Sequence, residues 1–172
     1  MMFEIGDLVI HLYHGAGRIT DIEKLQCLGS GKQYYAVGLF DTAKTRIWVS
    51  VQDAETGQLR QPVTQSRLDQ MWCVLQGVPE SLPTDHTERY AAIEDKLHTG
   101  NVLRIAEVLR DLSWKDRHVR GLTSESRRLY DHSMDLLASE VAIVEESEVM
   151  TAKAKITEII NLTVEANALS AG

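Results

Sequence analysis

The chain has 172 residues, of which 44% are hydrophobic, so it can bury one sizeable core or two small ones, and its composition excludes a disordered protein. Its formal net charge of −7 excludes a protein that coats nucleic acid by charge alone, because non-specific affinity comes from Lys and Arg side chains that neutralise phosphates. No apolar run approaches the roughly 20 residues of a membrane-spanning helix, and residues 1–7 lack the basic and apolar segments of an export signal. We therefore expect a cytoplasmic protein that contacts no membrane.

The residues that could carry chemistry form no recognisable catalytic or metal-binding pattern. Cys27 and Cys73 are far apart and have no CxxC partner, which favours reduced thiols over a disulfide or a zinc site. His11 and His14 have no third ligand at a suitable spacing, so we interpret them as structural or surface residues. An enzyme that uses His14 or Cys27 is the alternative, but no signature supplies a base for a nucleophile. We expect no catalytic residue, no metal, no cofactor and no small-molecule substrate.

The first 64 residues have the pattern of short β-strands. Segments rich in β-branched and aromatic residues are separated by glycine-containing turns at residues 15–17 and 29–32, and by a further turn at 41–44. The predicted strands cover residues 8–10, 17–22, 22–27, 33–40 and 45–51. Five short strands joined by tight turns predict a small, strongly bent, barrel-like sheet.

The last of these strands places polar and apolar side chains on opposite faces. Alternation puts Arg46, Trp48 and Ser50 on one side and Ile47, Val49 and Val51 on the other. An aromatic side chain on the polar side suggests an exposed binding edge. A short second core on that side is the alternative.

From about Thr64 onward the hydrophobic period changes to that of helices. Apolar residues recur at helical spacing between Leu68 and Leu75, and Gly77 marks the end of this first helix. Trp72 shares the apolar stripe of the helix, so we expect it to pack in a core.

Four further helices are predicted from their apolar stripes and capping residues. Thr84 or Asp85 can cap the second helix, and Thr123 can cap the fourth. The third helix has its apolar stripe over residues 102–112, and the fifth over residues 156–164. A compact helical region with about five helices is therefore expected.

A β-rich front and a helical rear, without alternation between the two, predict an α+β chain with two domains. We expect these domains to cover residues 1–60 and 65–168, with a short linker between them. Residues 122–172 hold 4 basic and 9 acidic side chains, so most of the negative charge lies at the rear. We interpret these acidic helices as a solvated face or a second protein-binding surface.

Residues 102–120 form a weak basic segment within this acidic chain. Its cations are Arg104, Arg110, Lys115, Arg117 and Arg120, and three acidic residues face them. The segment predicts either a phosphate contact or an ordinary solvated face. Trp114, in the same segment, either packs against a neighbouring helix, which we favour, or lies exposed as a contact for nucleic acid or protein.

Four motifs, in a particular order and spacing, carry a family resemblance. They are Phe3-x-Ile5-Gly6-Asp7-x-Val9, His14-Gly15-x-Gly17, Pro83-Thr84 with Arg89-Tyr90, and Ile105-Ala106-Glu107-Val108-Leu109-Arg110-Asp111-Leu112. Over residues 2–165 the chain resembles the CarD/CdnL family of bacterial RNA-polymerase-binding transcription regulators. The resemblance implies an N-terminal Tudor-like bent β-barrel, shared with transcription-repair coupling factors, followed by a compact all-α domain.

The resemblance also implies two partners. In the family, the barrel binds the β subunit of bacterial RNA polymerase, and the helical domain reaches promoter DNA at the upstream edge of the transcription bubble, where it modulates the stability of the open complex. Polymerase contacts then fall on Leu25, Arg46, Ile47, Trp48 and Val49. DNA contacts fall on His86, Arg89, Arg104, Arg110, Lys115, Arg117 and Arg120. Such a protein would associate with the nucleoid through the polymerase.

The chain departs from the family pattern at the residue that meets the DNA. His86 occupies the position of the tryptophan that wedges against the opened junction; its smaller ring can stack or, when protonated, contact phosphate. Glu88 stands where an arginine is common. These two residues and the net charge support an alternative, in which a divergent paralogue binds polymerase or another protein without acting on promoter DNA.

Overall fold

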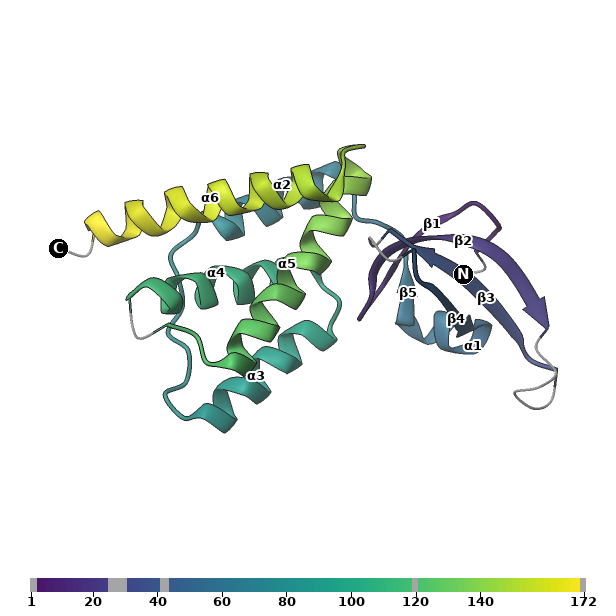
Figure 1. Cartoon of the computed structure of the whole chain (residues 1–172), viewed down its shortest axis with the longest axis horizontal. Helices are drawn as coiled ribbons and strands as arrows, with labels where there is room; N and C mark the ends of the chain where they lie inside the picture. Colours follow the sequence, from purple (N-terminus) through teal and green to yellow (C-terminus); the bar gives the residue numbers. More distant parts are fainter. Residues whose placement is uncertain (1–2, 25–30, 41–43, 119–120, 171–172) are drawn as a thin grey trace. The chain divides into compact units, whose positions relative to one another are not determined.

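The computed structural model describes residues 3–24, 31–40, 44–118 and 121–170. The chain forms two compact units, residues 1–62 and 63–172 (Figure 1). The first unit is built on a five-stranded sheet and the second consists of helices, which confirms the predicted α+β fold class. No helix within the described ranges is both long enough and apolar enough to cross a membrane.

The first unit contains an antiparallel sheet with the strand order β4-β3-β2-β1-β5. Its strands are β1 (Leu8–His11), β2 (Gly15–Lys24), β3 (Gln33–Leu39), β4 (Arg46–Ser50) and β5 (Leu59–Arg60). A short helix, α1 (Val51–Asp53), and a wide helical turn, η2 (Ala54–Gln58), connect β4 to β5. This order leaves β4 at one edge of the sheet.

The sheet differs from the predicted strand pattern in two places. The strands predicted at 17–22 and 22–27 fall on a single strand, β2, as far as Lys24; residues 25–27 of the second prediction lie outside the described part of the chain. The pairing of β2 with β3 is irregular after Ile19, and such an irregularity bends a strand without ending it. The fifth strand is β5, which pairs with β1 and is too short to show an alternating pattern.

The side chains of the sheet enclose a small core, and β2 and β3 approach each other closely beside it. At Gly17, a Cβ atom would lie 2.8 Å from the carbonyl oxygen of Gly38, so the close approach of the two strands requires a glycine. The buried residues of this core are Phe3, Val9, Ile19, Tyr35, Val37, Leu39, Val49, Ala54 and Leu59.

His11 organises the turn between β1 and β2. Its Nδ1 atom accepts hydrogen bonds from the amides of Tyr13 and His14 at 3.1 and 3.2 Å. Burial of the ring, and to a smaller extent the charge of His14, lower the pKa of His11 to about 4. The neutral ring is therefore part of the folded turn. Within the described ranges, no three His, Cys, Asp or Glu side chains gather in a way that could hold a metal ion.

The described residues of the second unit form five helices, in agreement with the sequence. They are α2 (Gln65–Leu75), α3 (His86–His98), α4 (Val102–His118), α5 (Ser124–Val144) and α6 (Val149–Ser170). The predicted caps are confirmed for α3, where Asp85 accepts from two backbone amides, and for α5, where Thr123 accepts from one. Gly100, with φ of 59°, follows the end of α3 in a conformation that favours glycine.

Helix α4 lies at the centre of the helical unit, where it contacts α2, α3, α5 and α6. Its predicted apolar stripe is buried, but so are Arg110, Asp111 and Ser113, so the buried surface is wider than a single stripe. Trp72 and Trp114 pack against the same core, as predicted. The ammonium group of Lys155 lies 4.7 Å from the ring centroid of Trp72.

The turn at His11 predicts a pH-dependent stability of the first unit. The free energy of unfolding should fall as the pH drops from about 6.5 to about 4, because the unfolded chain binds a proton on this imidazole in that range and the folded chain does not. The loss should be on the order of 2 kcal/mol, since solvent screens the group in part. Urea unfolding at several pH values, followed by NMR signals of the first unit, measures this loss.

Two variants provide the control. His11→Asn keeps an oxygen that can accept from the two amides and does not titrate, so most of the pH dependence should disappear. His14→Gln changes an exposed neighbour and should retain most of it. An unchanged pH dependence in His11→Asn would assign the effect to other groups.

Candidate functional site

Strand β4 presents the outer edge of the sheet. The amide of Leu39 donates to the carbonyl of Thr45 at 2.8 Å, which sets the phase of hydrogen bonding between β3 and β4. In that phase the backbone groups of Ile47 point to β3, and those of Arg46 and Trp48 point away from it. No other described strand pairs with β4, so these outward groups offer a hydrogen-bonding edge.

The side chains of Arg46 and Trp48 form a preorganised patch beside this edge. Trp48 is 46% exposed, and the guanidinium carbon of Arg46 lies 5.8 Å from its ring centroid. The Nε and Nη2 atoms of Arg46 donate to Oγ1 of Thr20 on β2 at 3.2 and 3.0 Å. Because these contacts already restrict the guanidinium, a partner that binds here has less side-chain entropy to remove.

The other residues predicted to contact polymerase are placed differently. Ile47 is half-buried, and Val49 lies in the core with 4% exposure, so its side chain is not available to a partner. The inward direction of Val49 follows from the alternation of β4, on the face opposite Trp48. Leu25 lies outside the described residues.

The start of α3 presents His86 on the surface of the helical unit. Asp85 accepts from the amides of Thr87 and Glu88, both at 2.9 Å. The bond from the Glu88 amide is the main cause that holds the pKa of the Asp85 carboxyl below its usual range. His86 itself is bound to another helix, because its Nε2 lies 2.8 Å from Oε2 of Glu125 in the first turn of α5.

Arg89, predicted to contact DNA, binds the backbone of the segment that precedes α3. Its side chain is buried, and Nη1 donates to the carbonyl oxygens of Pro83 and Thr84 at 2.9 and 3.0 Å. The guanidinium thereby holds the segment that precedes α3. Charged side chains are rarely buried without such partners. If the Arg89 guanidinium moved to DNA, the two carbonyl oxygens would lose their donor.

The cations of α4 are divided between two sides of the helix. Arg104 and Lys115 lie about 20° apart around the helix, and so do Arg110 and Arg117, but the two pairs are separated by roughly 120° or more. Arg104 pairs with Glu107 at 2.9 Å. The spacing therefore divides the basic segment between two faces, and of these four cations Arg110 is buried.

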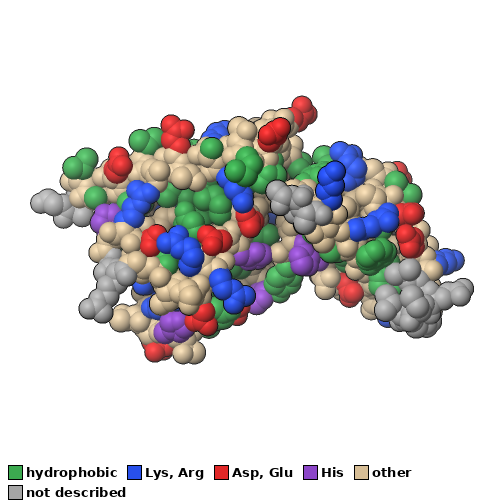
Figure 2. Space-filling view, in the orientation of Figure 1, with side chains coloured by type: hydrophobic (Ala, Val, Ile, Leu, Met, Phe, Trp, Pro, Cys, Tyr) green, Lys and Arg blue, Asp and Glu red, His purple; other side chains and the backbone are tan. Residues whose placement is uncertain are grey.

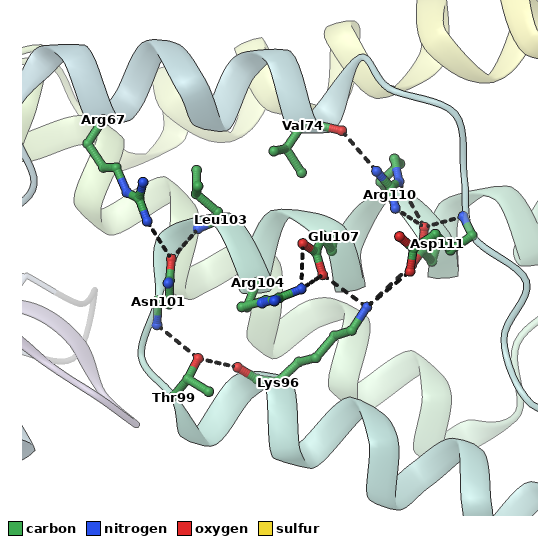
Figure 3. Close-up of polar contacts among 11 residues, drawn as sticks. Arg67, Val74, Lys96, Thr99, Asn101, Leu103, Arg104, Glu107, Arg110 and Asp111 are labelled. Atoms are coloured by element: carbon green, nitrogen blue, oxygen red, sulfur yellow. Dashed lines mark hydrogen bonds and ion pairs between the residues drawn. The ribbon is translucent and has the colours of Figure 1, made fainter.

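Arg110 of α4 and Lys96 of α3 belong to a network of polar contacts between α3, α4 and the segment before α3 (Figure 3). Arg110 contacts Oδ1 of Asp111 through Nε and Nη2, both at 2.8 Å, and Lys96 of α3 lies 3.0 Å from Glu107 and 3.9 Å from Asp111. Burial raises the pKa of Asp111, although Arg110 and the Glu80 amide act against it. Burial acts to raise the pKa of Glu107 as well, but hydrogen bonds from Arg104 and Lys96 hold it below its usual range.

The C-terminal end of α4 carries the remaining predicted DNA contacts. Arg117 bonds to Asn161 of α6, and His118 stacks on Trp114 with ring centroids 3.8 Å apart. Lys115 forms no ion pair with another described residue, and Arg120 lies outside the described ranges. On the face shown in Figure 2, Lys and Arg side chains over the helical unit are interspersed with Asp and Glu. On this face of the helical unit, the described cations are separated from one another by acidic side chains (Figure 2).

Sequence reasoning missed the partners that fix these residues. Thr20, Lys96 and Glu125 are far in sequence from the residues they hold, and no local pattern marks them. Glu140 is also buried, with Oε1 accepting from the amide of Val63 at 3.0 Å, so not every acidic residue at the rear of the chain belongs to a solvated face.

Comparison with known proteins supports both units. The model of the CarD-like/TRCF RID domain matches residues 3–63, and the model of the CarD C-terminal domain matches residues 70–157. The chain is also similar to a Bacillus subtilis (strain 168) protein named "Putative transcription factor YdeB". The two are 28% identical over 144 residues, which cover 83% of this chain and 92% of the relative. These matches confirm the resemblance found in the sequence motifs.

The network around α4 predicts that two arginines of one helix have different effects on stability. Arg110→Ala should lower the free energy of unfolding by about 3 kcal/mol, because it removes the nearest cation from the buried Asp111 carboxylate. Arg104→Ala, the matched control, should cost less than about 1 kcal/mol, because its pair with Glu107 is half exposed. Urea unfolding followed by helical circular dichroism measures both, and equal costs would contradict the structural assignment of Arg110.

Proposed function

The chain belongs to the CarD family of transcription factors, and we propose on this basis that it binds the β subunit of bacterial RNA polymerase through its sheet unit and modulates open promoter complexes through its helical unit. The matched RID domain coincides with the sheet unit, which supports polymerase contact there. Such a factor requires no catalysis. A protein that binds open promoter more tightly than closed promoter shifts the equilibrium by that difference in affinity.

The observation that carries this proposal is the outer edge of β4. Its outward backbone groups can pair with an extended strand of a partner, and main-chain hydrogen bonds tolerate changes in side chains. Arg46 and Trp48 flank this edge and are enriched residue types at protein interfaces. The contact would thus combine strand addition with an aromatic anchor.

The proposed contact with promoter DNA involves fewer groups than the sequence predicted. His86 is exposed at the start of α3, and Lys115 has no ion pair among the described residues. Aromatic side chains that stack on an unpaired base contribute about 1 to 3 kcal/mol per base. An imidazole ring is smaller than an indole ring, so the stabilisation of the open complex would be correspondingly smaller.

A second function is favoured by one observation, the internal bonding of the predicted cations. Arg89, Arg104, Arg110 and Arg117 all have partners within the protein. The protein would then bind polymerase, or another protein, without acting on promoter DNA. Where it binds polymerase, the protein would act in the cytoplasm and reach the nucleoid through the polymerase.

The docking proposal predicts an effect of Trp48 on polymerase binding. Trp48→Ala should weaken the binding of the full chain to bacterial RNA polymerase by about tenfold, as expected for an aromatic anchor. Phe40→Ala removes an aromatic side chain of similar exposure, 40%, that is not on β4, and should change binding little. Titration of labelled protein with core polymerase measures both. Equal losses, or none, would place the interface elsewhere.

The DNA proposal predicts a gain from His86→Trp. This variant should lengthen the lifetime of open complexes on a ribosomal-type promoter by up to about fivefold over the unmodified chain, because a larger ring stacks better. Lifetimes are measured after addition of a competitor, with polymerase binding checked separately. An effect of the unmodified chain that requires His86 supports promoter action, whereas an effect of the tryptophan variant alone supports the second function. If both proteins bind polymerase and neither changes the lifetime, the promoter contact is contradicted; if neither binds polymerase, docking is contradicted.

A further inference from the structure

The residue at the wedge position is held by a carboxylate from a different helix. Nε2 of His86 lies 2.8 Å from Oε2 of Glu125, and their side chains are 50% and 52% exposed. His86 is the first residue of α3, and Glu125 is in the first turn of α5. The pair therefore joins the N-terminal ends of two helices at the surface where DNA contact is proposed.

Neither helix depends on this pair to begin where it does. Asp85 caps α3 through two backbone amides, and Thr123 caps α5 through the amide of Ser126. Neither capping residue belongs to the His86–Glu125 pair. Loss of the Glu125 carboxylate should therefore leave the helix starts in place.

We infer that Glu125 limits the action of His86 on nucleic acid, as an internal competitor for the imidazole ring; the inference rests on the proposed promoter contact. A ring whose Nε2 is bound to a carboxylate must leave it before it stacks on a base or contacts a phosphate. The carboxylate that remains nearby repels the phosphate backbone. Glu125 is thus a positioning residue that acts through His86.

The size of the effect is limited by the exposure of the pair. Solvent-exposed ion pairs contribute little, which corresponds to at most about fivefold in an equilibrium constant. Glu125→Ala should therefore lengthen the open-complex lifetime supported by this protein by up to about fivefold. In a His86→Ala background, the same substitution should have no effect, because the ring that Glu125 holds is absent.

Glu88 provides the matched control. It is also an acidic residue in the first turn of a helix, α3, and Glu88→Ala removes the same charge near the start of α3 without breaking a bond to His86. A general loss of negative charge should act equally with and without His86. The experiment compares Glu125→Ala and Glu88→Ala, each in the unmodified and the His86→Ala chain, with cognate polymerase at saturation. Circular dichroism verifies that each variant is folded.

The outcomes separate this inference from the proposed function. A gain in Glu125→Ala that disappears in the His86→Ala background supports the inference, whether or not the unmodified chain itself changes the lifetime. Two results overturn the inference and leave promoter action intact. In the first, Glu125→Ala has the same effect in both backgrounds. In the second, Glu125→Ala has no effect although His86→Ala shortens the lifetime. If polymerase binds but no variant changes the lifetime, both the promoter contact and the inference fail.

Discussion

The burial of α4 among four other helices is the constraint on which the helical unit depends. A helix with neighbours on several sides cannot leave all its charged residues in solvent, so Arg110 and Asp111 enter the interior together and bind each other. Lys96 and Glu107 complete the charge balance from the adjoining faces. As a result, a segment that is basic in sequence is largely neutralised in the folded protein, which explains why few of its cations remain for phosphates.

In the sheet unit, by contrast, an edge strand keeps polar backbone groups without a described partner strand. β4 satisfies half of its backbone groups through β3, and the described part of the unit offers no strand to the other half. Unpaired edges promote association with other strands, so a protein that keeps one usually protects or uses it. Arg46, held by Thr20 and lying against Trp48, gives this edge a defined side-chain surface. The polymerase contact is therefore better supported by the structure than the DNA contact.

Features that depend on local periodicity could be predicted from the sequence. The helical period of α2 to α6, the caps Asp85 and Thr123, and the outward direction of Trp48 follow from residues close in the chain. Features that depend on packing could not. The apolar stripe of α4 gives no indication that Arg110 is also buried, and nothing near His86 in sequence points to Glu125. β5 was missed because two residues cannot show an alternation, and the pairing of β2, which the prediction divided, is irregular between Ile19 and Asp21.

The most direct test of the central claim is backbone hydrogen exchange of the full chain, alone and bound to core bacterial RNA polymerase. If a strand of the polymerase adds to β4, the outward amides of Arg46 and Trp48 exchange freely in the unbound protein and become protected in the complex. The amide of Ile47, already bonded to β3, should change much less. Unchanged exchange along β4, with protection appearing in another segment of a complex that does form, would contradict docking through this edge.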